Sequence, residues 1–124
     1  MGLLVSTCTI MAGVVYHRNR VWYGKSTTII IEGGAGIVKV SFESGDPLHA
    51  YIHDLSVVET QRGCGLGNKL LQLAEEEAQQ NENTVAVRLN VEKGRWAYDW
   101  YIRKGYVPFG KDGSLISLEK ILQK

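Results

Sequence analysis

The feature that most constrains the fold of this chain is a loop with glycine at every second position, Gly63, Gly65 and Gly67. The loop follows an apolar, strand-like run (50–58) and leads into a segment with helical periodicity (66–80). A strand, a glycine loop and a helix in this order leave backbone N–H groups open at the positive end of a helix dipole. The stretch therefore predicts a phosphate site, and a tight turn that needs glycine for its φ angles is the alternative.

The charges around this loop favour a bound anion. Arg62 and Lys69 lie at the start of the predicted helix, whereas Glu75, Glu76 and Glu77 lie further along it. A helix dipole prefers the reverse order, with acidic residues first and basic residues last. An anion held by the two basic side chains and the free backbone amides would explain the reversal.

Composition limits the size of the domain and its partners. A chain of 124 residues with 44% hydrophobic residues predicts one domain (1–124) that needs no disulfide or metal to form a core. The net charge of +1 argues against a nucleic-acid or membrane partner. Cys8 and Cys64 lie far apart and have no metal-ligand spacing, which favours the cytoplasm. The apolar stretch 3–15 is interpreted as a buried first strand rather than a signal peptide or a membrane span.

The hydrophobic pattern predicts an α+β domain with a mixed sheet, because hairpins at both ends flank a strand-helix-strand-helix order. The predicted elements are a hairpin over 3–24 turning at His17–Arg20, a second hairpin from strands 27–31 and 37–42, a strand at 50–58, a helix at 66–80, a strand at 84–91, a helix at 95–104, and a last hairpin from strands 106–109 and 115–121 turning at Gly110–Gly113.

Strict alternation assigns the side chains of these elements to faces. Along the strand 50–58 we expect His53, Leu55 and Val57 to share one face, with Asp54 on the other. On the helix 66–80 we expect the glutamate and glutamine positions to face outward.

Two tryptophans and two histidines are interpreted as having no binding or catalytic role. Trp96 and Trp100 lie one helical turn apart without basic neighbours, which favours core packing over a base-stacking platform. His17 and His49 lie in turn-like surroundings without metal-ligand spacing, so we expect both to be solvated.

Two motifs resemble the GNAT superfamily of acetyl-CoA-dependent N-acetyltransferases. The first is that family's loop, Arg/Gln-x-x-Gly-x-Gly/Ala, with Arg62, Gly65 and Gly67 at its key positions. The second resembles A-x-x-L-Y-x-x-x-G-F and is carried by Ala97, Trp100, Tyr101, Gly105 and Tyr106. With a closing strand at 118–122, the resemblance covers roughly residues 50–122.

The resemblance implies a mostly antiparallel central sheet with helices on its faces and with middle strands 50–58 and 84–91 splayed apart. It implies transfer of an acetyl group from acetyl-CoA to a primary amine of a small molecule or peptide, by direct attack in a ternary complex and without a metal. The pantetheine arm would lie in the gap and the pyrophosphate on the loop, with the carbonyl polarised by backbone N–H groups of a strand interrupted near Val57. The implied cofactor-binding residues are Leu55, Val57, Arg62, Gly63, Cys64, Gly65, Leu66, Gly67, Asn68, Lys69 and Asn90.

The resemblance also implies catalytic roles. Tyr101 would protonate the departing thiolate, a transfer that is uphill by roughly 2 kcal/mol from the ordinary pKa values of a phenol and a thiol; packing beside Trp100 is the alternative role. His53 is the leading base, in a register similar to that of arylalkylamine N-acetyltransferases. The alternatives to a His53 base are Asp54, Glu59 or water, and a purely structural histidine remains open.

Two departures from the family pattern set further expectations. Gly94 replaces a common asparagine of the second motif, so Asn90 or backbone groups would make that cofactor contact. The region before residue 50 lacks the two helices that usually wall the acceptor cleft, so we expect the second subunit of a homodimer to complete it through Trp22, Tyr23 or the terminal hairpin. A non-catalytic acyl-CoA-binding or regulatory module is the alternative function.

Overall fold

Alternating apolar residues build the first half of the chain into a meander of four strands. The computed structural model describes residues 13–123, in which β1 (Val14–Val21), β2 (Gly24–Ile31), β3 (Gly36–Glu43) and β4 (Asp46–Val57) each pair antiparallel with the next. The β-branched residues of β2 and β3 suit a pleated surface that is buried on one side. Ile29, Ile31, Val38 and Val40 face inward and are buried.

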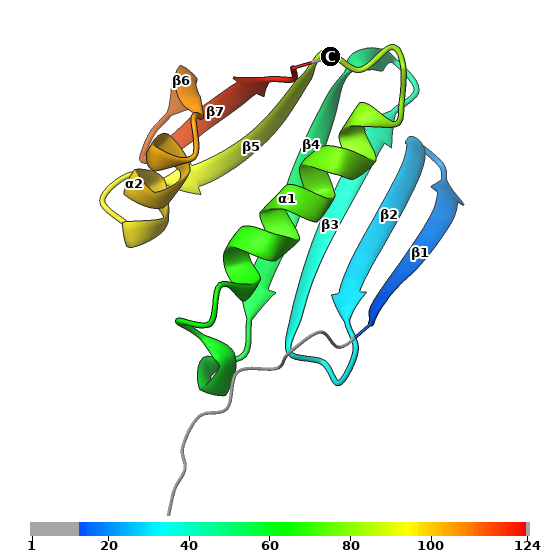
Figure 1. The fold of residues 1–124 in the computed structure, drawn as a ribbon. Helices are drawn as coiled ribbons and strands as arrows, with labels where there is room; N and C mark the ends of the chain where they lie inside the picture. The colour runs from blue at the N-terminus through cyan, green and yellow to red at the C-terminus, as the bar shows by residue number, and fades with distance from the viewer. Residues whose placement is uncertain (1–12, 124) are drawn as a thin grey trace, which may run out of the picture.

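The second half of the chain adds two helices and three strands. In order these are the 3-10 turn η1 (Glu59–Gln61), α1 (Leu66–Gln79), β5 (Ala86–Glu92), α2 (Trp96–Arg103), β6 (Val107–Asp112) and β7 (Leu115–Ile121). The seven-stranded sheet has the order β1-β2-β3-β4-β5-β7-β6, and β4–β5 is its parallel pair (Figure 1). The predicted α+β class and the mixed, mostly antiparallel sheet are confirmed.

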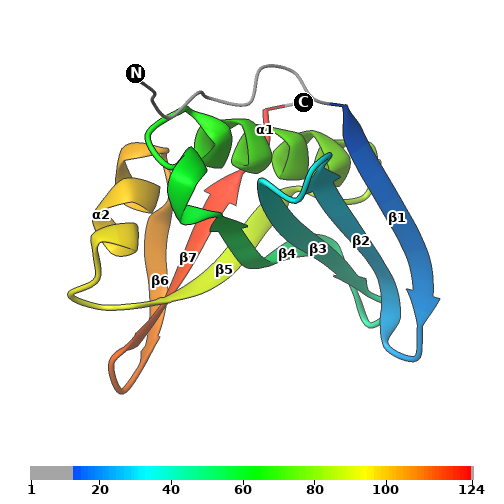
Figure 2. The same ribbon diagram turned by 90° about the horizontal axis from the view of Figure 1, so that it is seen from below.

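Both helices pack on the same side of the sheet, as Figure 2 shows. α1 contacts β2 to β5, α2 contacts β5, and their buried residues belong to one core that includes Leu70, Ala74, Tyr101 and Leu118. No helix within residues 13–123 covers the opposite side. Neither α1 nor α2 has the length and apolar character that a membrane span requires.

The first predicted turn is wrong. His17–Arg20 lie inside β1, and the chain turns instead at Trp22 and Tyr23, where β1 meets β2. Polar residues are tolerated here because β1 is an edge strand with exposed side chains. The predicted strand residues 3–12, like Cys8, lie outside the described residues.

The last predicted turn is also displaced. Gly110 belongs to β6, and the turn lies at Gly113 and Ser114. The register of the β6–β7 pair shifts between Pro108 and Gly110, so an irregularity in β6 allows a glycine within the strand.

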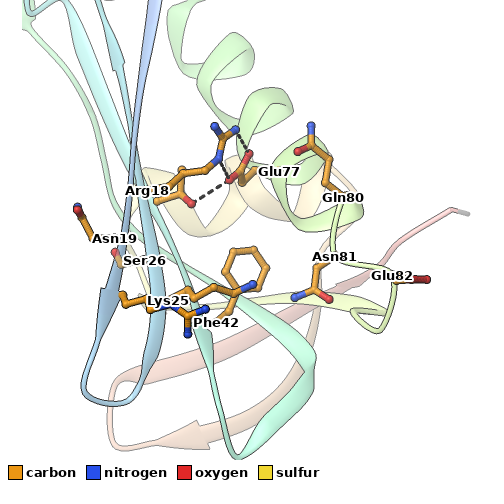
Figure 3. Close-up of a pocket in the computed structure, with 11 residues that line it drawn as sticks. Arg18, Asn19, Lys25, Ser26, Phe42, Glu77, Gln80, Asn81 and Glu82 are labelled. Atoms are coloured by element: carbon orange, nitrogen blue, oxygen red, sulfur yellow. Dashed lines mark hydrogen bonds and ion pairs between the residues drawn. The ribbon is translucent and has the colours of Figure 1, made fainter.

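Glu77 departs from the outward position predicted for the glutamates of α1. It is only 7% exposed and accepts hydrogen bonds from Arg18 Nε and Nη2, both at 2.8 Å, and from Thr27 Oγ1 at 2.9 Å (Figure 3). Glu75 likewise accepts a bond from the Tyr106 hydroxyl at 2.7 Å. Tertiary partners therefore account for acidic residues in the second half of α1, and a bound anion is not needed to explain them.

Candidate functional site

The strands β4 and β5 separate at the centre of the sheet. Their pairing is limited to His49–Tyr51 opposite Ala86–Arg88, although β4 continues to Val57 and β5 to Glu92. Figure 1 shows the two strands diverging from this point. Beyond Tyr51, the backbone groups of β4 that point toward β5 have no strand partner, which confirms the predicted splay.

A bulge interrupts β4 within the gap. Asp54 has φ 55°, the only positive φ of a non-glycine residue in the described chain. In the pairing of β3 with β4, Lys39 lies opposite His53 and Ile37 lies opposite Ser56. The chain therefore advances three residues along β4 but only two along β3, so β4 has one extra residue here. An extra residue of this kind bends a strand and redirects its side chains. The interruption expected near Val57 therefore occurs three residues earlier.

The bulge changes which side chains share a face. Ile52 pairs with Val40 and Val57 pairs with Gly36, so both lie on the side that packs against α1. His53 and Ser56 lie on the opposite side and are exposed. The expectation that His53 and Val57 share a face is therefore wrong, because strict alternation fails at the bulge.

The glycine loop is shaped for close approach of a ligand. Gly63 and Gly65 both have φ 82°, a left-handed conformation that other residues adopt at a cost. Gly65 is the N-cap of α1, and no side chain caps the first turn of the helix. The Arg62 Nε donates a hydrogen bond to the carbonyl of Val57 at 3.0 Å, which ties the loop to the end of β4. The first amides of α1 are thus available to an anion.

A groove of about 640 Å³ connects this loop with the end of β4 and with α2. It brings together eight of the predicted cofactor-binding residues, namely Leu55, Val57, Arg62, Gly63, Gly65, Leu66, Gly67 and Asn68. Cys64 and Lys69 are not among the lining residues, and Asn90 lines a neighbouring cavity. The α2 wall of the groove consists of Trp96 and Trp100.

A second cavity, of about 580 Å³, fills the gap between β4 and β5. Leu55 lines both the groove and this cavity, so the two adjoin. Tyr101 and His53, the two predicted catalytic residues, both line the cavity, as does Asp54. Glu59 lies exposed in η1 and lines neither space.

Tyr101 lies at the buried wall of the second cavity. Its side chain is 9% exposed and packs edge-on against Trp100 and Tyr106, with ring centroids 4.9 and 5.5 Å away. Burial raises the pKa of Tyr101 to about 12, so its hydroxyl stays protonated at neutral pH. Within the described residues that hydroxyl has no hydrogen-bond partner. Complete proton transfer to a thiolate would be uphill by about 5 kcal/mol, so donation of a hydrogen bond suits Tyr101 better.

His53 lies on the exposed side of β4. Its Nε2 is 2.9 Å from Ser41 Oγ, and one nitrogen of the ring remains for another contact. The neighbouring Asp54 is 3.8 Å from Lys39 Nζ, in an exposed ion pair. A base at His53 would therefore be positioned by Ser41, a contact that the sequence did not indicate.

A polar network beside the second cavity was also not predicted. Asp46 accepts hydrogen bonds from the Tyr51 hydroxyl at 2.6 Å and from His49 Nδ1 at 2.8 Å. The hydrogen bond from Tyr51 holds the pKa of Asp46 below its ordinary value, with a further contribution from His49. The expectation of a solvated His49 in a turn is therefore wrong, because His49 is a partly buried residue of β4.

Arg88 extends the polar surface from β5. Its Nε donates to Glu119 at 2.7 Å, and its guanidinium lies 4.2 Å from the centre of the Phe109 ring. Arg88 and Tyr51 both line the second cavity. The alternation in 84–91 predicted a separate polar face for Arg88. The partners of Arg88, Glu119 and Phe109, lie far away in the sequence, so the alternation could not predict them. Within residues 13–123, no group of three or more His, Cys, Asp or Glu side chains could hold a metal.

Trp96 was predicted to be a core residue, and this prediction is wrong. It is 75% exposed at the first position of α2, whereas Trp100 is partly buried against the core. The one-turn spacing correctly indicated a contact between the two, with ring centroids 6.3 Å apart. It could not show that α2 begins beside the glycine loop, which leaves Trp96 on the wall of the groove.

Comparisons with known proteins agree with this geometry. The model of the acetyltransferase (GNAT) family matches residues 14–106. No curated protein sequence matches the chain.

Several solved structures share the fold. Ard1 from Thermoplasma volcanium is 22% identical with a TM-score of 0.66, over 83% of this chain and 74% of that protein. The PaiA N-acetyltransferase from Thermoplasma acidophilum, solved in complex with coenzyme A, is 18% identical with a TM-score of 0.64, over 78% of this chain and 60% of that one. The IAA acetyltransferase from Bacillus cereus is 17% identical with a TM-score of 0.65, over 89% of this chain and all of that one (100%).

Proposed function

Because the chain belongs to the acetyltransferase (GNAT) family, we propose that it transfers an acetyl group from acetyl-CoA to a primary amine of a small molecule or peptide, by direct attack in a ternary complex. The observation that supports this proposal best is that the groove and the second cavity meet at Leu55. The groove ends at the N-terminus of α1, which no side chain caps, and the second cavity is lined by Tyr101 and His53. A donor in the groove would present its thioester to an amine in the cavity.

The groove fits the phosphate-bearing part of acetyl-CoA. Gly63 and Gly65 have no atoms within 4 Å of the position that a Cβ would occupy, so the loop leaves open space over its amides. Arg62 adds a positive charge at the same edge. Acetyl-CoA supplies the reactive thioester, and the residues of this chain orient it.

The second cavity provides groups for each stage of the transfer. The unpaired backbone N–H groups of β4 that face the gap can polarise the thioester carbonyl. As the amine nitrogen bonds to the acetyl carbon, the carbon–sulfur bond breaks and the nitrogen loses a proton to His53 or to water. The departing thiolate accepts a hydrogen bond from the Tyr101 hydroxyl and is protonated from solvent.

Binding of coenzyme A and release of its thiol from acetyl-CoA test this proposal. Calorimetry should detect CoA binding, and screening small amines and peptides as acceptors should reveal thiol release. Replacing the tyrosine (Tyr101→Phe) should leave CoA binding intact and lower turnover by about 100-fold. Tyr98→Phe is the matched control on the same helix and should keep the wild-type rate.

A non-catalytic acyl-CoA-binding module is the second candidate. Gly94, with φ 88°, offers no side chain to the cofactor, and no described helix walls the open side of the sheet. CoA binding without thiol release for any acceptor, and without an effect of Tyr101→Phe, would identify this second function. Absence of CoA binding by the wild-type protein would contradict both candidates.

We propose that the protein acts in the cytoplasm and that a second copy completes the acceptor cleft. The net charge of +1 supports a small amine or peptide as the acceptor over nucleic acid or membrane. The uncovered side of the sheet supports a homodimer, with Trp22, Tyr23 or the β6–β7 hairpin at the contact.

A further inference from the structure

We infer that Trp96 is a stacking platform for the adenine base of acetyl-CoA, an inference that rests on the proposed function. Trp96 is 75% exposed, yet it lines the groove that contains the glycine loop. An exposed indole beside a ligand groove presents a large apolar face that water solvates poorly. A purine base has a matching flat face and gains from stacking on such a ring.

The order of groups along the donor path places Trp96 at the nucleotide end. The reacting end lies at Leu55, where the groove meets the cavity that contains Tyr101. The diphosphate belongs at the loop, because the open amides of α1 and Arg62 lie there. The nucleoside follows the diphosphate in CoA, so it leaves the loop at its outer side, where the groove is bounded by the start of α2.

Packing beneath Trp96 holds the ring in place. Trp100 contacts the indole edge-on, with ring planes at 65°. A Cβ placed on Gly67 would lie 3.7 Å from the Trp100 ring, so Trp100 also sets the spacing between the loop and α2. Trp100 is thus the support, and the outer Trp96 ring remains free to meet a ligand.

A contact from Trp96 would also replace one that this chain lacks. Gly94, two residues before Trp96, has no side chain to offer the donor. Stacking of the adenine on Trp96 would supply affinity for the nucleotide without a side chain at position 94.

Three variants test the inference by calorimetry with CoA. Trp96→Ala should raise the dissociation constant for CoA about tenfold, whereas Trp96→Phe should recover most of the affinity because it retains an aromatic face. Ile102→Ala is the matched control, since Ile102 is an exposed apolar residue of the same helix that lines neither space of the site. Circular dichroism and thermal unfolding of each variant verify that the fold is intact.

A second ligand separates the base from the rest of the donor. 4′-Phosphopantetheine has the arm and one phosphate but no nucleoside, and its affinity, titrated by NMR up to millimolar concentrations, should be the same for wild type and Trp96→Ala. An equal loss of affinity for both ligands would overturn the inference, because Trp96 would then contact the arm. Unchanged CoA affinity in folded Trp96→Ala would overturn it as well. Both results require a wild-type protein that binds CoA, so they are distinct from a failure of the proposed function.

Discussion

Two glycines of the loop serve different purposes, and exchanging each for alanine separates them. At Gly65 the φ of 82° disfavours any Cβ, so Gly65→Ala should lower the free energy of unfolding by about 1–2 kcal/mol. Gly67 is inside α1, where alanine has the higher helix propensity, and its Cβ would only touch Trp100 at 3.7 Å. Gly67→Ala should therefore leave stability equal or raise it by up to about 1 kcal/mol.

Urea unfolding and CoA calorimetry of both variants provide the measurement. Gly67→Ala should still weaken CoA binding, because its methyl group would stand in the groove. Equal stability losses for the two variants would mean that the left-handed conformation of Gly65 is not what the loop requires.

The burial of Tyr101 makes a prediction about pH. Because the pKa of Tyr101 is raised to about 12, its hydroxyl remains a hydrogen-bond donor across the whole working range. The ratio of wild-type to Tyr101→Phe turnover should therefore stay constant between about pH 6 and pH 10. Initial rates of thiol release across this range are the measurement. A ratio that falls as the pH approaches 10 would show that the phenol ionises and does not act as proposed.

At the scale of elements, the contact between β1 and α1 depends on one buried carboxylate. The hydrogen bond from Arg18 lowers the pKa of Glu77, burial opposes this shift, and Thr27 adds to it. A carboxyl whose pKa is lower in the folded state stabilises the fold above its unfolded pKa, and this contribution is lost as the pH falls through the folded pKa. Glu77 should therefore stabilise the protein at neutral pH and progressively less below about pH 4.5.

Urea unfolding of Glu77→Gln tests this contact. The variant should lose about 1–3 kcal/mol at pH 7, because hydrogen bonds to a charged group are replaced by weaker ones. The difference from wild type should shrink in acid as the native carboxyl is protonated. Glu76→Gln, at an exposed neighbouring position, is the control and should change stability little at either pH. A loss that is independent of pH would indicate packing rather than charge.

The elements themselves were largely predictable from periodicity. The helix predicted at 66–80 is α1 at Leu66–Gln79, and the helix predicted at 95–104 is α2 at Trp96–Arg103. Local apolar spacing predicts both helices, the polar run 81–83 marks the end of the first, and Gly105 marks the end of the second. The β1 strand was misjudged because its polar centre resembles a turn. Its position at the edge of the sheet and the hydrogen bond from Arg18 to the distant Glu77 both depend on the tertiary structure.

The site was predictable where it depends on local sequence and unpredictable where it depends on tertiary contacts. Apart from Cys64, the residues from Arg62 to Asn68 line the groove, because the spacing of the glycines determines the shape of the loop. The bulge at Asp54 was not predictable, since a strand with an extra residue has the same alternating pattern until its partner is known. The exposure of Trp96 also depends on where α2 packs, which spacing within the helix does not reveal.

At the scale of the whole molecule, two features of the surface within residues 13–123 bear on assembly. One is the side of the sheet opposite the helices, and the other is the outer edge of β6, whose residues are all exposed. Val107 in β6 is apolar and 62% exposed. An unprotected edge of this kind favours pairing with another strand.

These features lead to a test of the proposed homodimer. Light scattering at micromolar concentration should give twice the 13.8 kDa mass of the chain. If the contact is formed by β6, Val107→Lys should yield monomers, because a charge on an edge strand opposes pairing. If it is formed by the β1–β2 turn, Trp22→Ala should do so instead. Val85→Lys, at an exposed apolar position outside both surfaces, is the control and should leave the mass unchanged. A wild-type protein that is monomeric while it releases CoA would show that one chain alone completes the acceptor cleft.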